Sequence, residues 1–396
     1  MNQAPMQTTL AAVSLVVLAN GPLFFIERRV FGLPGSWEGP VMQPVIVLTI
    51  AAAVVMIAAL QRPIIAAVPV ASSIAFGVWA TASAEWSLQP DLTLWRGLLY
   101  VGLPFVAWII AGLDHDRLVT ALGAAGLALV SVSAALVVLW PSVALDQNND
   151  WRGVMTGRNS LAPICGVALI VACGLIAERR RHSGALLLVL GGAGLLGSGS
   201  RTAWFALLIA AGVASVALLA RRRDTLAAAA GLGAIGAAGL IVGIRRFWNE
   251  PTFQQRRTIW DLVGDIAADT RWHGVGWEAF WYTPELHNHE LLQRGSAHGS
   301  VPELLLGVGV VGLVLWLVVV VSALVGVART MWREPGAEAW TWAALVVFLV
   351  VENLTESFVL WFSYNWVLLI AAALRFGPGP RTRSVRRIDV PNAAVT

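Results

Sequence analysis

Charged residues are scarce in this chain of 396 residues, of which only 13% are Asp, Glu, Lys or Arg. An average soluble protein contains about a quarter. Hydrophobic residues make up 57%, and the mean hydropathy is +0.72. Apolar runs of about 20 residues, the length that an α-helix needs to cross a bilayer, recur along the chain. The composition therefore predicts an all-α polytopic membrane protein whose partners include the lipid bilayer and no nucleic acid.

Cysteine and lysine are also scarce or absent. The two cysteines, Cys165 and Cys173, lie within one apolar run, which argues against a disulfide framework and against a metal site. Every one of the 27 basic residues is arginine, a bias that a GC-rich genome explains without any function. His287 and His289 stand two apart without a fixed partner, which is a weak metal signal. We expect no metal and no cofactor.

About twelve apolar segments meet the length criterion for membrane helices. They lie near 8–26, 41–60, 63–83, 93–112, 118–140, 160–177, 184–199, 202–220, 225–244, 300–328, 339–352 and 355–375. The predicted organisation is nine spans in 1–244, a polar insert at 245–298, three spans in 299–375 and a basic tail at 376–396. The first span follows a polar leader without basic residues, so we expect a retained helix rather than a cleaved signal peptide.

Arginine placement predicts the orientation of these spans. Alternate threading puts four arginine-rich segments on one side: 179–181, 221–223, 329–333 and 375–387. By the positive-inside rule this side is cytoplasmic, together with both termini, so the insert faces outside. Arginines at the outer helix ends run against the rule and indicate an anionic ligand at the outer surface. They are Arg28, Arg29, Arg96, Arg152, Arg158 and Arg201.

The insert 245–298 holds six arginines and four of the six histidines. Long polar loops are usually functional, although a solvated connector between two spans is the alternative. Thr252 and Gln255 have capping-box spacing, which predicts a helix that runs to about Ala268. Arg256 falls on the buried face of that helix. A buried arginine needs a partner, and either a bound anion or an acidic residue elsewhere in the insert would serve.

Two further sites are expected at the outer face. In the turn Gly197–Thr202, Arg201 and a helix N-terminus have the features of a phosphate site, and a turn with a snorkelling arginine is the alternative. Ser300 and Glu303 have capping-box spacing, which assigns Glu303 to the helix start rather than to catalysis. His298 then stands just ahead of a span, where an imidazole acts as a base or merely satisfies a helix end.

Several short motifs resemble the O-antigen ligase/polymerase superfamily. In the insert they are Arg256-x-x-x-Trp260, the segment His273–Phe280 and Ala297-His298 ahead of Leu304–Gly312. Upstream, Trp151–Val154 and Gly157–Ala162 resemble its exopolysaccharide-production branch, Ser198–Thr202 is similar to the family's Ser-Arg segment, and Glu85–Pro90 and Leu354–Ser357 also fit. Two departures are Arg158, where the family usually has Lys, and Gly299, where Asn or Ser often follows the histidine.

The resemblance implies a GT-C-like, metal-independent glycosyltransferase in the bacterial cytoplasmic membrane, with its active site facing outside. Such enzymes move a glycan from an undecaprenyl diphosphate carrier to a hydroxyl of a glycan or glycolipid acceptor. Arg201, Arg256 and Arg158 would bind the diphosphate. His298 would be the base, with Glu356 as the other candidate for that role.

Two questions stay open at this point. Trp260, Trp272, Trp277 and Trp281 either stack on sugar rings or anchor the insert at the membrane interface. A transporter or flippase for polysaccharide or lipid-linked glycan is the alternative function. Transporters usually carry ionisable groups at mid-membrane, whereas the charges here cluster at one face.

Overall fold

The computed structural model describes residues 4–30, 41–60, 68–219, 250–284 and 289–377. Within these ranges the chain is helical, with one isolated bridge between Leu145 and Trp151 in place of any strand. The helices are α1 (Ala4–Val17), α2 (Gly21–Phe25), the π-helical turn Ile26–Val30, α3 (Met42–Leu60), α4 (Val68–Ala82), α5 (Pro90–Ala111), α6 (His115–Leu139), α7 (Pro141–Ala144), α8 (Arg158–Ala177), α9 (Arg181–Ser198), α10 (Arg201–Leu219), α12 (Pro251–Ala267), α13 (Ser300–Arg333), α14 (Ala337–Thr355) and α15 (Tyr364–Phe376).

The prediction of an all-α polytopic membrane protein is confirmed. Among the described residues, 6 helices are long and apolar enough to cross a membrane, namely α3, α5, α6, α8, α13 and α14. The bent pair formed by α1 and Gly21–Arg29 adds a seventh if it is one span, and α10 and α15 are shorter apolar helices. Each predicted span overlaps at least one helix except the one at 225–244, which lies outside the described residues.

The first and the last predicted spans differ from the helices in the structure. The first, near 8–26, bends by 54° between α1 and the segment that begins at Gly21. Asn20 stands at this break with a left-handed φ of 63°, and Pro22 follows. The last predicted span starts nine residues too early, because α14 ends at Thr355 and α15 begins only at Tyr364. The intervening turn at 356–363 contains two left-handed residues, Trp361 and Phe362, which rule out a continuous helix there.

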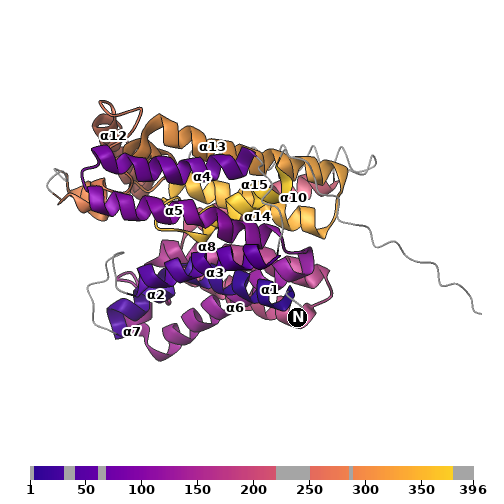
Figure 1. The fold of residues 1–396 in the computed structure, drawn as a ribbon. Coiled ribbons are helices and arrows are strands. Elements are labelled where there is room, and N and C mark those ends of the chain that lie inside the picture. The colour runs from indigo at the N-terminus through magenta and orange to yellow at the C-terminus, as the bar shows by residue number, and fades with distance from the viewer. Residues whose placement is uncertain (1–3, 31–40, 61–67, 220–249, 285–288, 378–396) are drawn as a thin grey trace, which may run out of the picture.

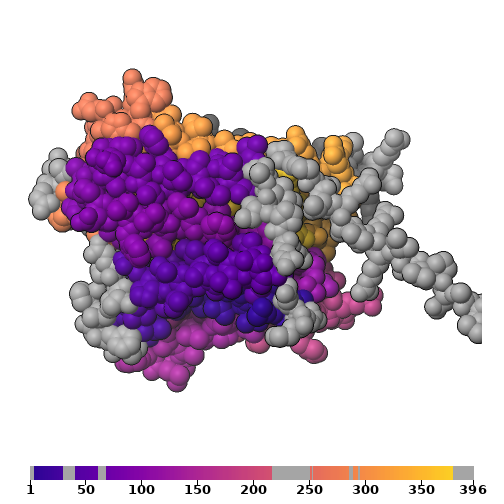
Figure 2. Space-filling view, in the orientation of Figure 1, coloured from indigo at the N-terminus to yellow at the C-terminus, as the bar shows by residue number. Residues whose placement is uncertain are grey.

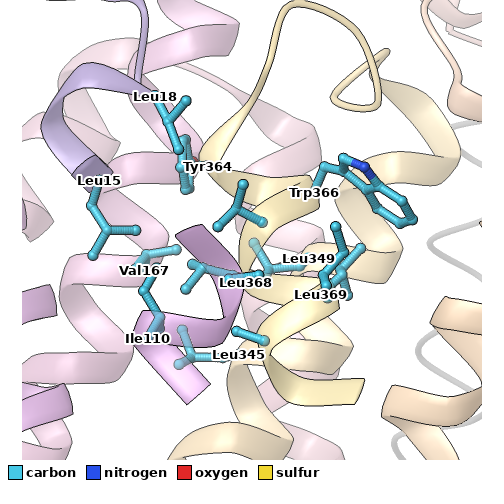
Figure 3. Packing of buried hydrophobic residues seen from close by; sticks show 14 of the residues in the cluster. Leu15, Leu18, Ile110, Val167, Leu345, Leu349, Tyr364, Trp366, Leu368 and Leu369 are labelled. Carbon is cyan, nitrogen blue, oxygen red and sulfur yellow. The ribbon is translucent and has the colours of Figure 1, made fainter. Parts of the chain in front are cut away.

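Helix α15 is the centre of the bundle. It packs against α4, α5, α13 and α14, and its residues from Tyr364 to Ala373 are all buried. Figure 3 shows Tyr364 and Leu368 facing Leu15 and Val167, while Trp366 points away from them. A helix that is apolar all round is stable when neighbours cover every face, which is the position that α15 occupies. The turn at 356–363 is therefore attached to a helix that is buried along most of its length.

The segments that carry the predicted site meet at one end of the bundle, which we call the site end. It consists of the loops at 83–89, 140–157, 199–200 and 356–363 together with the insert from 250 to 299, as far as these are described. Figure 1 shows α7 and α12 at this end and the N-terminus at the opposite end. In the space-filling view the region of α12 projects beyond the membrane helices (Figure 2).

Candidate functional site

The insert is a folded unit with a small core of its own. On α12, Ile259 and Val263 are buried and pack with Phe280, Leu292, Ala297 and Leu306. The predicted helix to about Ala268 is confirmed, but the predicted capping box is wrong. The N-cap is Glu250 and the helix begins at Pro251, because proline suits the first helical turn and Thr252 already lies inside the helix.

A kink in α13 anchors the insert to the membrane helices. Gly309 has φ 66° and ψ −166°, a conformation open to glycine, and it interrupts the helix. The insert fills this interruption: the backbone N–H of Val310 donates to the carbonyl of Arg271 at 2.8 Å, and that of Val275 donates to Leu306 at 2.8 Å. A Cβ on Gly309 would come within 2.3 Å of the carbonyl carbon of Trp272, so the contact requires glycine.

Three predicted site residues, Arg256, His298 and Glu356, converge at the site end. The guanidinium of Arg256 donates to Glu356 Oε1 at 2.5 Å and to the carbonyl of Thr355 at 2.5 Å. His298 Nδ1 lies 3.7 Å from Glu356 Oε2. Asn159, at the start of α8, donates to Glu356 Oε1 at 3.0 Å. One carboxylate thus joins four segments that are far apart in the sequence.

This environment acts on the ionisation of Glu356. Burial raises the pKa of the carboxyl, but the charge of Arg256 and the neighbouring His298 lower it by more. The net pKa lies below the ordinary value of a glutamate. The carboxylate is therefore held ionised and is a weaker proton acceptor than a free glutamate. Its partner Arg256 comes from the insert, but Glu356 does not, so the predicted acidic partner within the insert is wrong.

Arg201 and Arg158 form ion pairs with other acidic residues. Arg201 NH1 is 2.6 Å from Glu250 Oε2, the N-cap residue of α12, and its side chain is 69% exposed. Arg158 pairs with Asp150 and directly precedes Asn159. The Asp150 carboxylate also abuts the left-handed Gly199 ahead of α10. These contacts link the starts of α8, α10 and α12. Arg201 has the most accessible side chain of the three predicted site arginines.

Arg96 does not fit the expectation of an anionic ligand. Its guanidinium is buried, 2% exposed, and pairs with the 1% exposed carboxylate of Glu278. It also donates to the Tyr282 hydroxyl at 2.7 Å and stacks over that ring. Arg96 is therefore a structural residue that holds the insert to α5. A buried arginine in an apolar run signals such a partner, but the sequence offers no means of choosing Glu278.

The tryptophans of the insert have three different environments. Trp277 is fully buried and packs edge-on against Phe76, so its stacking on a sugar ring is excluded. Trp260 and Trp281 use their indole N–H groups inside the protein, donating to the Ala297 carbonyl and to Glu303 respectively. Trp272 is 61% exposed and alone among these four presents a large accessible face.

The second predicted capping box is also wrong in detail. Helix α13 begins at Ser300, but its N-cap is Gly299 and no side chain caps it. The carboxylate of Glu303 reaches back past the helix start to the backbone N–H of Ala297. The hydroxyl of Ser300 donates instead to Asn353 at 2.7 Å. Sequence spacing located the start of the helix but not the partners of these two side chains.

The described residues contain no cluster of side chains suited to a metal ion. No set of three or more His, Cys, Asp or Glu side chains is placed there to hold a metal ion. His289 Nδ1 accepts the N–H of Leu291, and His287 lies outside the described residues. Cys165 is buried, Cys173 is exposed, and both are free thiols.

Comparison with known proteins gives two matches. A family model described as O-antigen ligase matches residues 186–317, which include Arg201, Arg256 and His298. The exopolysaccharide production protein ExoQ of Rhizobium meliloti (strain 1021) is 25% identical over 289 residues. That alignment covers 66% of this chain and 66% of ExoQ, slightly less than two thirds of the relative's length. The chain is therefore a polytopic membrane protein that resembles the O-antigen ligase superfamily and, through ExoQ, its exopolysaccharide-production branch.

Proposed function

We propose that this protein is a membrane glycosyltransferase. It moves a glycan from an undecaprenyl diphosphate carrier to the hydroxyl of a glycan or glycolipid acceptor, outside the bacterial cytoplasmic membrane. The similarity to O-antigen ligases and to ExoQ supports the class of reaction. The observation that carries the proposal is the meeting of Arg256, His298 and Glu356 at the site end.

In this proposal His298 is the base and Glu356 orients it. Glu356 Oε1 is occupied by Arg256 and Asn159, while Oε2 faces His298 Nδ1. A carboxylate beside one imidazole nitrogen holds the proton there and leaves the other nitrogen, Nε2, free to accept one. The lowered pKa of Glu356 makes it a poor base in its own right. The separation of 3.7 Å exceeds a hydrogen bond, and such distances shorten when substrate binds.

The reaction is then a single displacement at the anomeric carbon of the donor sugar. The acceptor oxygen forms a bond to that carbon as His298 Nε2 takes the hydroxyl proton. The bond from the carbon to the diphosphate oxygen breaks, and the electron pair remains on the diphosphate. Arg201, whose side chain is 69% exposed, and Arg158 bind the leaving diphosphate, and cations held in place for developing charge are effective catalysts. The proton finally leaves His298 for solvent.

Arg256 has two functions in this scheme. Its contact with Glu356 keeps the carboxylate ionised, and its contact with the Thr355 carbonyl fixes the guanidinium in place. We also assign it a contribution of positive charge toward the diphosphate. An arginine performs both tasks because its planar fork has several donors, whereas a lysine is a single point charge.

The test is transfer by purified protein in lipid nanodiscs, with a lipid-linked oligosaccharide donor and an acceptor glycan. His298→Ala is expected to lose about 10²–10⁴-fold in rate, the usual contribution of a general base. Arg201→Ala is expected to weaken donor binding, and His289→Ala, on the exposed surface, serves as the matched control. Normal turnover by His298→Ala together with inactive Glu356→Gln would move the base to the carboxylate. A wild-type protein that transfers no lipid-linked glycan would refute the proposed function.

A further inference from the structure

Glu303 is a buried carboxylate that accepts hydrogen bonds from three donors. It is 2% exposed and lies in the first turn of α13. Its Oε1 accepts the backbone N–H of Ala297 at 2.5 Å and the hydroxyl of Ser357 at 2.8 Å. Its Oε2 accepts the indole N–H of Trp281 at 2.8 Å. A carboxylate with three buried donors is ordered much more firmly than one that merely caps a helix.

The donors to Glu303 lie next to the site residues in the sequence. Ala297 directly precedes His298, and Ser357 directly follows Glu356. The hydroxyl oxygen of Ser357 in turn accepts the N–H of Gly299, which follows His298, at 3.1 Å. Hydrogen bonds therefore hold the residues on both sides of His298, through the side chains of Glu303 and Ser357. The bond between these two side chains also holds the residue next to Glu356.

We propose that Glu303 is a positioning residue that sets the distance between His298 and Glu356. The inference rests on the proposed function, since it assumes that this pair does the chemistry. Glu303 itself does not touch substrate, because it is buried and both of its oxygens are in use. It acts by joining the segment 297–299 to the turn at 356–357, which belong to different helix connections.

The backbone of segment 297–299 needs an external contact to hold its conformation. His298 has a left-handed φ of 51°, and the N-cap of α13 has no side-chain hydrogen bond. Without Glu303, the N–H of Ala297 and the hydroxyl of Ser357 would lose a buried acceptor, which the surrounding apolar core would not replace. The segment 297–299 would then relax away from Glu356. A misplacement of about 1 Å costs roughly 10²-fold in rate when it affects reacting groups.

The kinetic test compares Glu303→Gln with the exposed control Glu290→Gln, and Ser357→Ala with Ser357→Thr. An amide at position 303 directs its NH₂ at a donor and breaks part of the network. We expect kcat for Glu303→Gln and Ser357→Ala to fall by about 10–100-fold with KM for the lipid-linked donor unchanged. Ser357→Thr keeps the hydroxyl and is expected to retain most activity. In a His298→Ala background, Glu303→Gln is expected to add no further loss, because the residue acts through the histidine.

A second measurement is independent of activity. Hydrogen exchange at the amides of Ala297 and Gly299 is expected to accelerate in Glu303→Gln and not in Glu290→Gln. If the wild-type protein transfers no glycan, the proposed function fails. The exchange rates still decide whether Glu303 holds the segment 297–299 in place. Full activity in Glu303→Gln, or an equal additional loss in the His298→Ala background, would overturn the positioning role.

Discussion

The buried pair of Arg96 and Glu278 gives the sharpest stability prediction for this fold. Both side chains are almost inaccessible, at 2% and 1% exposure. Glu278 also accepts the backbone N–H of Trp361 at 3.1 Å, so the pair links α5, the insert and the turn at 356–363. Removing one member leaves the other charge buried and unpaired, which typically costs about 3–5 kcal/mol. We expect Glu278→Gln and Arg96→Gln each to destabilise the protein by that amount.

A loss of this size is easy to measure. It changes the unfolding equilibrium by roughly two to three and a half orders of magnitude. Reversible denaturation in mixed micelles, followed by tryptophan fluorescence, reports it because Trp277 is part of the adjoining core. The control is Arg117→Gln, which removes an ion pair whose side chains are 45% and 55% exposed, and is expected to cost less than about 1 kcal/mol.

A double variant separates burial from charge. Arg96→Met with Glu278→Gln removes both charges and is expected to be more stable than either single Gln variant, because no unpaired ion remains. If Glu278→Gln alone lowers the free energy of unfolding by less than about 1 kcal/mol, water reaches the pair and its proposed role in anchoring the insert is wrong.

Three further predictions concern topology, charge and pH. The topology test uses single cysteines in a Cys173→Ser background. Cysteine introduced at Ala268 is expected to react with an impermeant thiol reagent in intact cells, and cysteine introduced at Ser183 is not. The reverse pattern would show that the membrane orientation is opposite to the predicted one. Arg256→Ala is expected to abolish transfer. Arg256→Lys is expected to restore part of it, because lysine keeps the positive charge but lacks the two-pronged guanidinium. Full activity of the alanine variant would make Arg256 purely structural. Since the pKa of Glu356 is lowered in the folded state, its stabilising contribution is present at neutral pH and is lost as the pH falls through that pKa. Glu356→Gln is therefore expected to reduce stability at pH 7 but to have little effect in acid, as measured by denaturation at both pH values.

The membrane helices were predictable because their cause is local. A run of about 20 apolar residues must bury its backbone polar groups in a helix whatever its neighbours are. The breaks were less predictable, because they depend on single backbone angles. The turn at 356–363 contains the unbroken apolar run 358–362, yet Trp361 and Phe362 are left-handed there. Their conformation is fixed by contacts from Glu278 and Tyr100, which the sequence does not reveal.

The site shows the same division between local and distant causes. Motif resemblance identified Arg256, His298 and Glu356, and each lies in the cluster. Their pairing was not predictable, since Arg256 and Glu356 are 100 residues apart in the sequence. Spacing also misassigned Glu303 to a capping box. Capping rules consider one helix end, whereas this carboxylate also accepts hydrogen bonds from Trp281 and Ser357 in two other segments. Asn159 gave no signal of its own, since an amide beside an arginine is unremarkable in sequence.

The backbone of His298 yields a final prediction that separates catalysis from stability. At φ 51° the residue is in the left-handed region, which non-glycine residues rarely enter and which Asn, Asp and His tolerate best. Strain of this kind gathers at functional sites, where the surrounding structure compensates for it. His298→Asn keeps a residue that accepts this conformation, whereas His298→Ala adds a penalty on the order of 1 kcal/mol. Both variants are expected to lose transfer equally, because neither has an imidazole, but only the alanine variant is expected to unfold at lower denaturant concentration. If His298→Asn retained activity, the imidazole would not be the base, since an amide cannot accept a proton from an alcohol.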